Sequence, residues 1–565
     1  MTDLLTNLRT IVGKRHVLTS AAATRSYRTG YRFGSGAAVA VVRPGSLVEQ
    51  WRVLQACVAA DVIVITQAAN TGLTGGSTPD GDDYDRDVVI VSTTRLKGVQ
   101  LIGGARQVIC LPGATLFELE RRLRTVGREP HSVIGSSCFG ASVLGGVCNN
   151  SGGALVQRGP AYTELALFAR ATEQGLELVN HLGVALGNEP EEMLCRLEQG
   201  RYAETDVVHD PARQASDRDY AQHVRRIDEP TPARFNADAR RLYEAAGSAG
   251  RLMVFAVRLD TFPAEANSRV FYIGTDDPDE LTTLRRTILG EFEHLPIAGE
   301  YMHRTAFDIA RVYGKDLFLA VQHLGTDRLP GLFGWKARFE NVVRRLRVFG
   351  QTPADRLMQG ASRLFPEHLP RRLIEYRNRF EHHLMLRVSA GAAEEACASL
   401  AGMFPSATGD FFECTPDEGA KAFLHRFAAA GAAVRYRAVH HKEVEDIVAL
   451  DVALPRNDRE WLETLPADVE APILHKLYYG HFLCHVFHQD YIVAKGHDTL
   501  ALEHRMWELL DRRGAEYPAE HNIGHLYPAK PAMRDFYREL DPCNQLNPGI
   551  GQTSKHRHWA GPECH

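Results

Sequence analysis

Apolar residues recur at helical spacing in two early segments of the chain. In residues 46–59, one face of the expected helix carries apolar side chains throughout: Val48, Trp51, Leu54 and Val58. Ser46 and Glu49, three residues apart, have the form of a capping box at its start. Residues 115–126 repeat the helical spacing. We therefore predict two amphipathic helices in this region.

Short, nearly continuous apolar runs lie between and after these helices. Residues 62–65, 87–92 and 252–259 are of this kind and predict buried strands. Helices mixed with short strands and glycine-rich turns indicate an α+β fold. Residues 187–232 are polar and charged with weak periodicity, so we expect a surface insertion or loop there.

Two glycine-rich loops are the clearest candidates for chemistry. The first, Gln67 to Ser77, follows the apolar run at 62–65; the second covers residues 134–142 and continues through 145–153. Loops of this composition let main-chain N–H groups approach a diphosphate. Each loop alone would more simply be a set of turns, but two within ninety residues suggest one large phosphate-bearing cofactor.

Length and composition limit the class of protein. A chain of 565 residues is too long for one core, so two or three domains are expected. The ten cysteines include no CxxC pair, which argues against a zinc ribbon or a dithiol motif. The N-terminus lacks a signal-peptide pattern, and no apolar run approaches the ~20 residues of a membrane span.

Charge is distributed unevenly. The whole chain has a net charge of −5, yet residues 328–379 hold twelve Lys or Arg against four acids and are therefore +8, which leaves −13 elsewhere. An uneven charge distribution of this kind gives information about binding partners rather than about the fold. A solvated charged face is the simple explanation, and contact with an anionic membrane surface is the functional one.

Several motifs resemble a known group of flavoproteins. Residues 39–79 are similar to the FAD-binding domain of the vanillyl-alcohol oxidase (PCMH) type, and residues 134–153 match its second half. Residues 247–254 resemble its closing strand, and residues 541–549 match a terminal motif of its 2-hydroxy-acid dehydrogenase branch. Over nearly its whole length the chain resembles the quinone-dependent, membrane-associated D-lactate dehydrogenases of Gram-negative bacteria.

The resemblance implies a particular organisation. A two-part PCMH-type FAD-binding domain would comprise residues 1–260 and be completed by residues 512–565. An α/β cap domain, residues 261–302 and 380–511, would cover the flavin. Residues 303–379 would form an inserted basic segment that contacts the membrane.

The resemblance also assigns the cofactor contacts to the two loops and the closing strand. The residues expected to bind FAD are Ala68, Ala69, Asn70, Thr71, Gly72, Gly76, Ser77, Gly135, Ser142, Gly152 and Val254. Neither loop carries a histidine or tyrosine placed like the family's flavin-linking residues, so noncovalent FAD is expected.

His521 is the candidate general base. Residues 520–524, Glu-His-Asn-Ile-Gly, resemble the Glu-His-Gly-x-Gly of related dehydrogenases, whose histidine takes the substrate hydroxyl proton. Imidazole has a suitable pKa for this transfer near neutrality. Asn522 departs from the pattern, since the relatives have glycine there.

His481 and His488 have the spacing of two histidines that, in related D-2-hydroxy-acid dehydrogenases, hold a divalent metal together with the glutamate equivalent to Glu520. Such a metal would polarise the substrate. The intervening residues differ from those relatives, and Asp490 stands where they have asparagine. The alternative is that both histidines bind substrate directly, without metal.

Arg426 lies in a stretch resembling the relatives' Leu-Trp-x-x-Arg, whose arginine binds the substrate carboxylate. A surface or membrane-facing position is the alternative for this residue.

The implied reaction is oxidation of (R)-lactate to pyruvate, with hydride transfer to FAD and electron delivery to ubiquinone or menaquinone. The implied location is peripheral, on the cytoplasmic face of the inner membrane. There, basic residues contribute about 1 kcal/mol each near anionic phospholipid, and the aromatics Phe333, Trp335 and Phe339 can insert at the interface. No second nucleotide motif for NAD is evident.

Other functions remain open at this stage. The flavoenzyme could act on another D-2-hydroxy acid or pass electrons to oxygen. A non-enzymatic protein could use the basic stretch to bind nucleic acid, in which case it would be colourless and its binding salt-sensitive.

Overall fold

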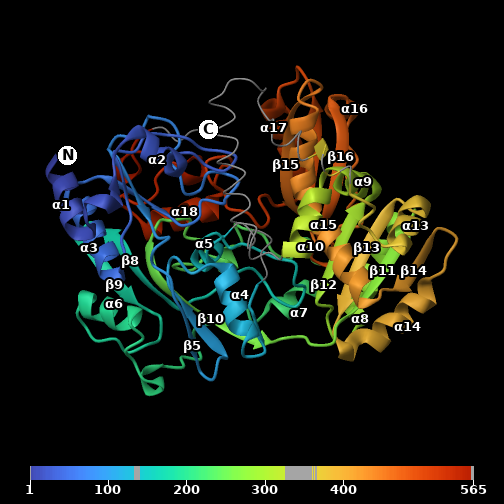
Figure 1. Cartoon of the computed structure of the whole chain (residues 1–565), viewed down its shortest axis with the longest axis horizontal. Helices are drawn as coiled ribbons and strands as arrows, with labels where there is room; N and C mark the ends of the chain where they lie inside the picture. Colours follow the sequence, from blue (N-terminus) through green and yellow to red (C-terminus); the bar gives the residue numbers. More distant parts are fainter. Residues whose placement is uncertain (1, 133–139, 325–358, 361, 363–364, 562–565) are drawn as a thin grey trace.

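The computed structural model describes residues 2–132, 140–324, 359–360, 362 and 365–561. Two bodies lie side by side (Figure 1), one built on two sheets from the first 263 residues and the other on a single seven-stranded sheet. The last residues of the chain return to the first body, where helix α18 (Pro531–Leu540) lies.

The first sheet has the order β1-β2-β4-β3. Strands β2, β3 and β4 are parallel, and β1 is antiparallel to β2. The bounds are β1 Val17–Leu18, β2 Ala40–Val42, β3 Ile63–Gln67 and β4 Val88–Ser92, with helices α1 Thr2–Val12, α2 Ala21–Arg28 and α3 Leu47–Ala59. The predicted runs at 62–65 and 87–92 are therefore confirmed as β3 and β4.

Helix α3 begins where the sequence predicted, and its cap differs in one detail. The Ser46 hydroxyl accepts the main-chain N–H of Glu49 at 3.1 Å, as in a capping box. The Glu49 carboxylate, however, accepts the N–H of Gly45 at 2.6 Å instead of that of Ser46. Leu47 and Trp51 are buried in the core beneath the helix.

The second sheet is antiparallel, with the order β5-β6-β10-β8-β9 and β7 paired to the end of β10. Its bounds are β5 Val99–Ile102, β6 Gln107–Cys110, β7 Arg128–Pro130, β8 Ala166–Thr172, β9 Gly175–Asn180 and β10 Met253–Pro263. Helices α4 (Leu116–Arg124) and α5 (Val143–Cys148) share a buried apolar cluster with β6, β8 and β10. Strand β10 begins one residue later than predicted, and α4 confirms the second predicted helix.

Residues 187–232 are not simply loop, contrary to the sequence-based prediction. They include α6 (Pro190–Glu198) and the short α7 (Tyr220–Val224). Leu194 and Leu197 of α6 are fully buried in the core that α3 also covers. Together with the partly buried Met193, these two leucines hold the nine-residue helix on the core, although most of its other positions are charged.

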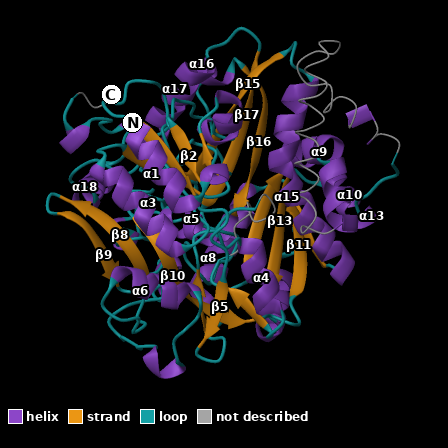
Figure 2. Ribbon diagram, turned by 60° about the vertical axis from the view of Figure 1, so that its left-hand side comes forward, coloured by secondary structure: helices purple, strands orange, loops and turns teal. Residues whose placement is uncertain are grey.

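The seven-stranded sheet of the second body is antiparallel, with the order β14-β11-β13-β12-β16-β17-β15 (Figure 2). Its strands are β11 Arg269–Thr275, β12 Ala298–His303, β13 His382–Val388, β14 Gly409–Glu413, β15 Val444–Ala453, β16 Ile473–His481 and β17 Val486–Ala494. Its helices are α8 Pro278–Glu291, α9 Arg304–Tyr313, α10 Lys315–Leu324, α13 Arg371–Arg379, α14 Ala393–Met403, α15 Pro416–Val439, α16 Ala467–Glu470 and α17 Thr499–Arg512.

Helices cover both faces of this sheet. One core joins it to α8, α14 and α17, and the other joins it to α9, α13 and α15. The long helix α15 starts at a full capping box, in which Thr415 and Glu418 bind each other's main-chain N–H. Ala422, Ala429 and Ala432 on α15 let α9 approach closely. The cap expected from the sequence thus combines helices and strands around an antiparallel sheet.

The C-terminal segment closes on the first body by main-chain bonds. Val64 in β3 donates to Gln545 O at 3.0 Å, and Asn547 donates back to Val64 O at 2.9 Å. The Asn547 side chain also donates to Gly76 O and Ala249 O, at 2.9 and 2.7 Å. Residues 545–547 therefore tie the first glycine-rich loop to the start of β10.

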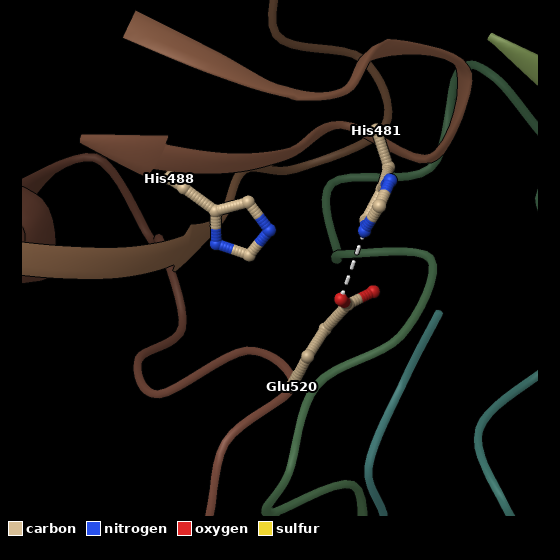
Figure 3. A group of neighbouring side chains, drawn as sticks. All are labelled: His481, His488 and Glu520. Atoms are coloured by element: carbon tan, nitrogen blue, oxygen red, sulfur yellow. Dashed lines mark ion pairs between the residues drawn. The ribbon is translucent and has the colours of Figure 1, made fainter. Parts of the chain in front are cut away.

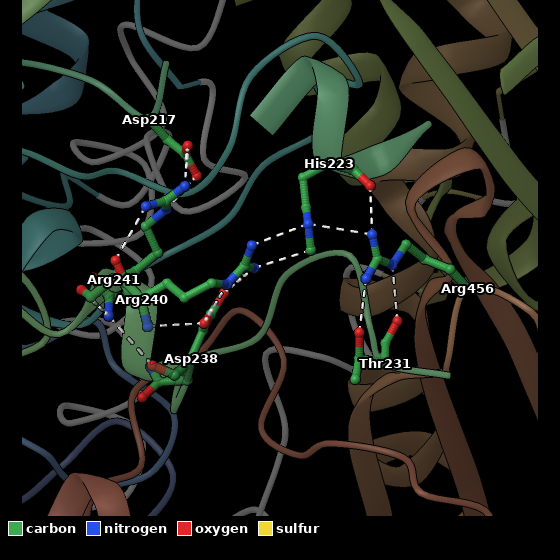
Figure 4. Close-up of polar contacts among 9 residues, drawn as sticks. Asp217, His223, Thr231, Asp238, Arg240, Arg241 and Arg456 are labelled. Carbon is green, nitrogen blue, oxygen red and sulfur yellow. Dashed lines mark hydrogen bonds and ion pairs between the residues drawn. The ribbon is translucent and has the colours of Figure 1, made fainter. Parts of the chain in front are cut away.

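A polar network, buried at Arg456 and partly exposed at Arg240, joins the two bodies (Figure 4). Arg456, which follows β15, donates to His223 O at 2.5 Å and to the Thr231 hydroxyl at 2.7 Å. On its other side, the His223 ring lies 3.0 Å from the guanidinium of Arg240, which pairs with Asp238. The Arg456 guanidinium is buried, and these contacts satisfy donors that burial would otherwise leave unpaired.

Among residues 303–379, the basic segment of the sequence-based prediction, the structure describes mainly α9, α10 and α13. Ala306 and Phe307 of α9 are buried in the core of the second body. Residues 325–358, 361, 363 and 364 of this segment, which include Phe333, Trp335 and Phe339, lie outside the described residues. Within the described ranges, no helix has the length and apolar character required to cross a bilayer.

Candidate active site

One cavity of about 1600 Å³ lies between the two bodies and contains nearly every site residue predicted from the sequence. Its walls come from both glycine-rich loops, from strands β12, β15, β16 and β17, and from helices α10, α15 and α17. The cavity therefore brings the expected cofactor loops and the expected catalytic residues to the same place.

The predicted cofactor residues that line this cavity form a wall of small side chains. They are Ala68, Ala69, Asn70, Thr71, Gly72, Gly76, Ser77, Ser142, Gly152 and Val254. Gln67 holds the first loop closed, because its side-chain amide donates to Tyr27 O at 2.9 Å and to Ser77 O at 2.6 Å. Gly135 lies outside the described residues.

At two of these glycines, the segment that carries the candidate base, residues 520–522, comes so close that a larger residue would clash with it. A Cβ at Gly152 would lie 2.3 Å from the Glu520 carboxylate, and one at Gly72 would lie 2.4 Å from the side-chain amide of Asn522. Thr74 donates to Asn522 O at 2.8 Å, which anchors the same segment. Asn522, the residue that departs from the family motif, thus fastens the catalytic segment to the first glycine-rich loop.

Strand register sets the catalytic side chains beside one another. Glu300 in β12 pairs directly with His481 in β16, and Asp451 in β15 pairs directly with His488 in β17. Directly opposed residues have Cβ atoms about 5 Å apart. Glu520 and His521 then enter from the loop after α17.

Asp451 holds the candidate base from two directions. Its Oδ2 lies 3.0 Å from His521 Nδ1 and also accepts the main-chain N–H groups of Glu520 and His521, at 2.7 and 3.0 Å. Burial by itself would lower the pKa of His521, but the carboxylates of Asp451 and Glu520 together raise it above the usual value. Burial likewise opposes charge on Asp451, whose pKa is nevertheless held well below its usual value by His521 and His488. Because Asp451 contacts Nδ1 of His521, the other ring nitrogen, Nε2, is the one that can accept a proton from a substrate.

His481 lies between two carboxylates. Its Nδ1 is 2.6 Å from Glu300 Oε1, and its Nε2 is 3.1 Å from Glu520 Oε2. Burial opposes a charged imidazole, but Glu300 and Glu520 together raise the pKa of His481 to about 10. Glu520 is also buried, yet Arg234, at 2.5 Å, and His481 lower its pKa to about 2.

The predicted metal ligands do come together (Figure 3). Donor atoms of His481, His488 and Glu520 all lie within 4.8 Å of one another. Two donor atoms bound to one ion at about 2.1 Å each lie roughly 3 Å apart, close to the separation of His481 Nε2 and Glu520 Oε2. Two imidazoles and a carboxylate are a donor set that suits a divalent transition metal.

Arg426 is buried, with 8% of its surface exposed, so the alternative of a surface position is wrong. Its Nε lies 3.0 Å from Glu300 Oε2, and its guanidinium lies over the Tyr479 ring at 4.6 Å. Glu300 therefore connects Arg426 to His481, and the guanidinium faces the same cavity.

Sequence reasoning missed four supporting residues: Arg234, Glu300, Asp451 and Tyr479. Asp451 and Glu300 were visible as single acids within apolar strand sequences, Ile447 to Leu454 and Ile297 to Met302. A buried acid in such a strand needs a partner, which marks it as a candidate. Nothing in the sequence names that partner.

Comparison with known proteins identifies the family. The family described as "D-lactate dehydrogenase, membrane binding" matches residues 270–559, and the FAD binding domain family matches residues 38–166. A quinone-dependent D-lactate dehydrogenase of Escherichia coli (strain K12) is 59% identical over 98% of this chain and 97% of its own length. The chain belongs to this family. A relative of the same description from Haemophilus influenzae is 57% identical over 99% of both chains.

Solved structures confirm the PCMH-type fold of this family member. A 4-ethylphenol oxidase from Gulosibacter chungangensis matches with a TM-score of 0.56 at 12% identity, and p-cresol methylhydroxylase with a TM-score of 0.57 at 11% identity. Each match covers 97% of this chain and 96% of the other. The resemblance stated from sequence, the α+β fold and the FAD-dependent oxidoreductase class are confirmed.

Proposed function

We propose that this D-lactate dehydrogenase family member oxidises (R)-lactate to pyruvate, uses FAD as the hydride acceptor and delivers the electrons to a membrane quinone. The observation that carries the proposal is the pairing of Asp451 with His521 in the cavity that is also lined by the two glycine-rich loops, here called the cradle. A proton acceptor and a place for the flavin thus share one space.

The cradle fits FAD in this family because its wall consists of small side chains and main chain. Residues 67–77 and 140–153 contain no histidine or tyrosine, which supports noncovalent binding. When bound, FAD takes the hydrogen on the substrate's α-carbon as a hydride. Asn547 and Gln67 hold the first loop in place for it.

His521 removes the hydroxyl proton of (R)-lactate, and Asp451 fixes the ring so that Nε2 is the accepting nitrogen. Asp451 also stabilises the imidazolium that results, since its carboxylate is already ionised. Arg426 binds the substrate carboxylate. Glu300 takes only Nε of that guanidinium, and the terminal nitrogens suit a two-point contact.

His481, His488 and Glu520 would hold a divalent metal, which would polarise the substrate hydroxyl and carboxylate. The alternative role is direct: a protonated His481, held between Glu300 and Glu520, donates to the substrate. Elemental analysis of the purified protein distinguishes the two.

The membrane description of the family supports a peripheral position. We place the protein on the cytoplasmic face of the inner membrane, with residues 303–379 against anionic phospholipid. Ubiquinone or menaquinone would then be within reach of the reduced flavin. The +8 charge of residues 328–379 supports this orientation.

Anaerobic addition of (R)-lactate to the purified protein tests the proposal. The yellow absorbance should bleach within the turnover time, and a quinone should restore it. (S)-lactate and other D-2-hydroxy acids, tested in the same way, define the substrate. Bleaching by a different acid but not by (R)-lactate would replace the proposed substrate.

A further inference from the structure

We propose that the lipid-soluble quinone binds in an apolar arm of the active-site cavity, between α10 and α15. The arm is lined by Leu317 and Ala320 of α10 and by Phe423, Phe427, Gly431 and Val434 of α15. This inference rests on the proposed function, since the reduced flavin is its electron donor.

The arm is continuous with the catalytic chamber. Arg426 and Phe427 are neighbours on α15, and the cavity that contains Arg426, His521 and the glycine-rich loops also contains Phe427 and Val434. One uninterrupted cavity therefore connects the flavin cradle to the arm. A ligand in the arm can reach the flavin without passing through protein.

The chemistry of the arm suits an isoprenoid quinone. Residues 423, 427, 431 and 434 recur at helical spacing, so one stripe of α15 presents only apolar groups to the cavity. Two arginines at its edge are paired with acids: Arg435 with Asp316 at 2.8 Å and Arg437 with Asp446 at 3.0 Å. Pairing lowers the cost of placing an apolar ligand beside these charges.

The outer end of the arm, here called its mouth, lies at Val434, which is 53% exposed. Two further apolar residues of the cavity lining, Tyr31 and Leu500, are 63% and 51% exposed. An apolar lining that reaches the protein surface suits an apolar ligand that enters from outside. Helix α10 ends at Leu324, directly before the strongly basic stretch that begins at Arg328. The mouth is thus connected by sequence to the segment proposed to contact the membrane.

The length of the arm fits this use. Arg426 and Val434 are eight residues apart on one helix, which corresponds to about 12 Å at 1.5 Å per residue. A quinone ring at the inner end would face the flavin, while the isoprenoid tail runs along the stripe to the mouth. The step balances: the reduced flavin loses two electrons and one proton, and with one further proton from solvent the quinone becomes quinol.

Gly431→Leu tests the arm on the intact holoenzyme. Gly431 and Leu317 both line the arm, and a Cβ at Gly431 would lie 3.1 Å from Leu317 Cδ2, so a leucine fills the arm at this point. Leucine also favours the helix over glycine. The KM for quinone should rise at least tenfold, while the rate of flavin reduction by (R)-lactate stays within twofold. Gly402→Leu at the end of α14, where a Cβ meets nothing within 4 Å, is the matched control and should change neither quantity.

Labelling with an azidoquinone gives a readout independent of turnover. In vesicles, light should attach the probe to peptides of α10 and α15 in the parent and in Gly402→Leu, and labelling should fall severalfold in Gly431→Leu. Val434→Glu, at an exposed position, should weaken labelling without affecting folding.

The outcomes separate the two proposals. If (R)-lactate fails to bleach the flavin, the proposed function is wrong. If it bleaches normally but the label attaches elsewhere, or Gly431→Leu leaves the quinone KM unchanged, the assignment of the arm is wrong. Displacement of the label by phospholipid alone would make the arm a lipid site and would also overturn the assignment.

Discussion

The Asp451 carboxylate binds His521 twice, at the ring Nδ1 and at the main-chain N–H, both at 3.0 Å. The first contact selects the tautomer of the imidazole, and the second fixes the position of its Cα. A proton acceptor held at both points loses little entropy when the substrate arrives. The pairing depends on β15 lying at the edge of the seven-stranded sheet, next to the cavity.

We expect His521→Ala to abolish bleaching of the flavin by (R)-lactate while FAD stays bound, because the imidazole that takes the hydroxyl proton is removed. Asp451→Asn should slow bleaching by roughly 100-fold or more, since the ring loses its orienting charge. Stopped-flow absorbance measures both. The exposed His497→Ala is the control, and full bleaching in His521→Ala would remove His521 from this role.

Arg426→Lys should raise the KM for (R)-lactate at least tenfold, because an ammonium group cannot make the two-point contact of a guanidinium. Arg437→Lys is the matched control: it lies on the same helix but pairs with Asp446 outside the catalytic cluster. Steady-state kinetics with a saturating acceptor give the answer. Equal KM values in the two variants would show that Arg426 does not bind the carboxylate.

The purified protein should contain about one divalent metal ion per chain, and His488→Ala should lower that content severalfold, since it removes one of three ligands. The exposed His441→Ala should retain the metal. Mass spectrometry of the elements, on samples dialysed against metal-free buffer, measures the content. A parent protein without metal that still oxidises (R)-lactate would favour direct substrate binding by His481 and His488.

Three buried histidines should make the second body sensitive to acid. Burial lowers the pKa values of His382, His383 and His425 to about 3, against about 6.5 in an unfolded chain. Below pH 6.5 the unfolded state therefore binds more protons, and stability falls as the pH decreases towards 3. Each histidine contributes a slope of up to about 1.4 kcal/mol per pH unit.

Urea unfolding between pH 6.5 and 4.5 checks this expectation. His383 lies beside the Tyr272 and Phe307 rings. Its replacement by Phe should reduce the slope of the free energy of unfolding against pH by up to about 1.4 kcal/mol per pH unit. His497→Phe, at an exposed position, should leave it unchanged. Identical slopes in parent and His383→Phe would mean that His383 is not held neutral.

Replacing Arg344, Arg345 and Arg347 by glutamate should release the protein from anionic vesicles, because six units of charge change at the proposed membrane contact. The control replaces Arg121, Arg122 and Arg124 of α4, which makes the same charge change elsewhere. Sedimentation with vesicles distinguishes the two. Binding that is unaffected by the first triple change would place the contact outside this segment.

The sequence by itself determined the local features of this protein. Glycine-rich runs, helical spacing at 46–59 and 115–126, and apolar runs at 62–65 and 87–92 each depend on residues close together in the chain. The motif around His521 and the histidine pair 481 and 488 are equally local, so they were found together with their family resemblance. Helix α6, within residues 187–232, was not predicted because its core-facing apolar residues, Met193, Leu194 and Leu197, span little more than one helical turn.

The tertiary structure alone decided which side chains act together. Glu300 meets His481, and Asp451 meets both His488 and His521, through strand register and loop closure over separations of up to 181 residues. The apolar arm likewise requires α10 and α15 to pack side by side, although about a hundred residues separate them. A one-residue shift of register would turn each of these side chains to the opposite face of its sheet, and no local pattern in the sequence reports that choice.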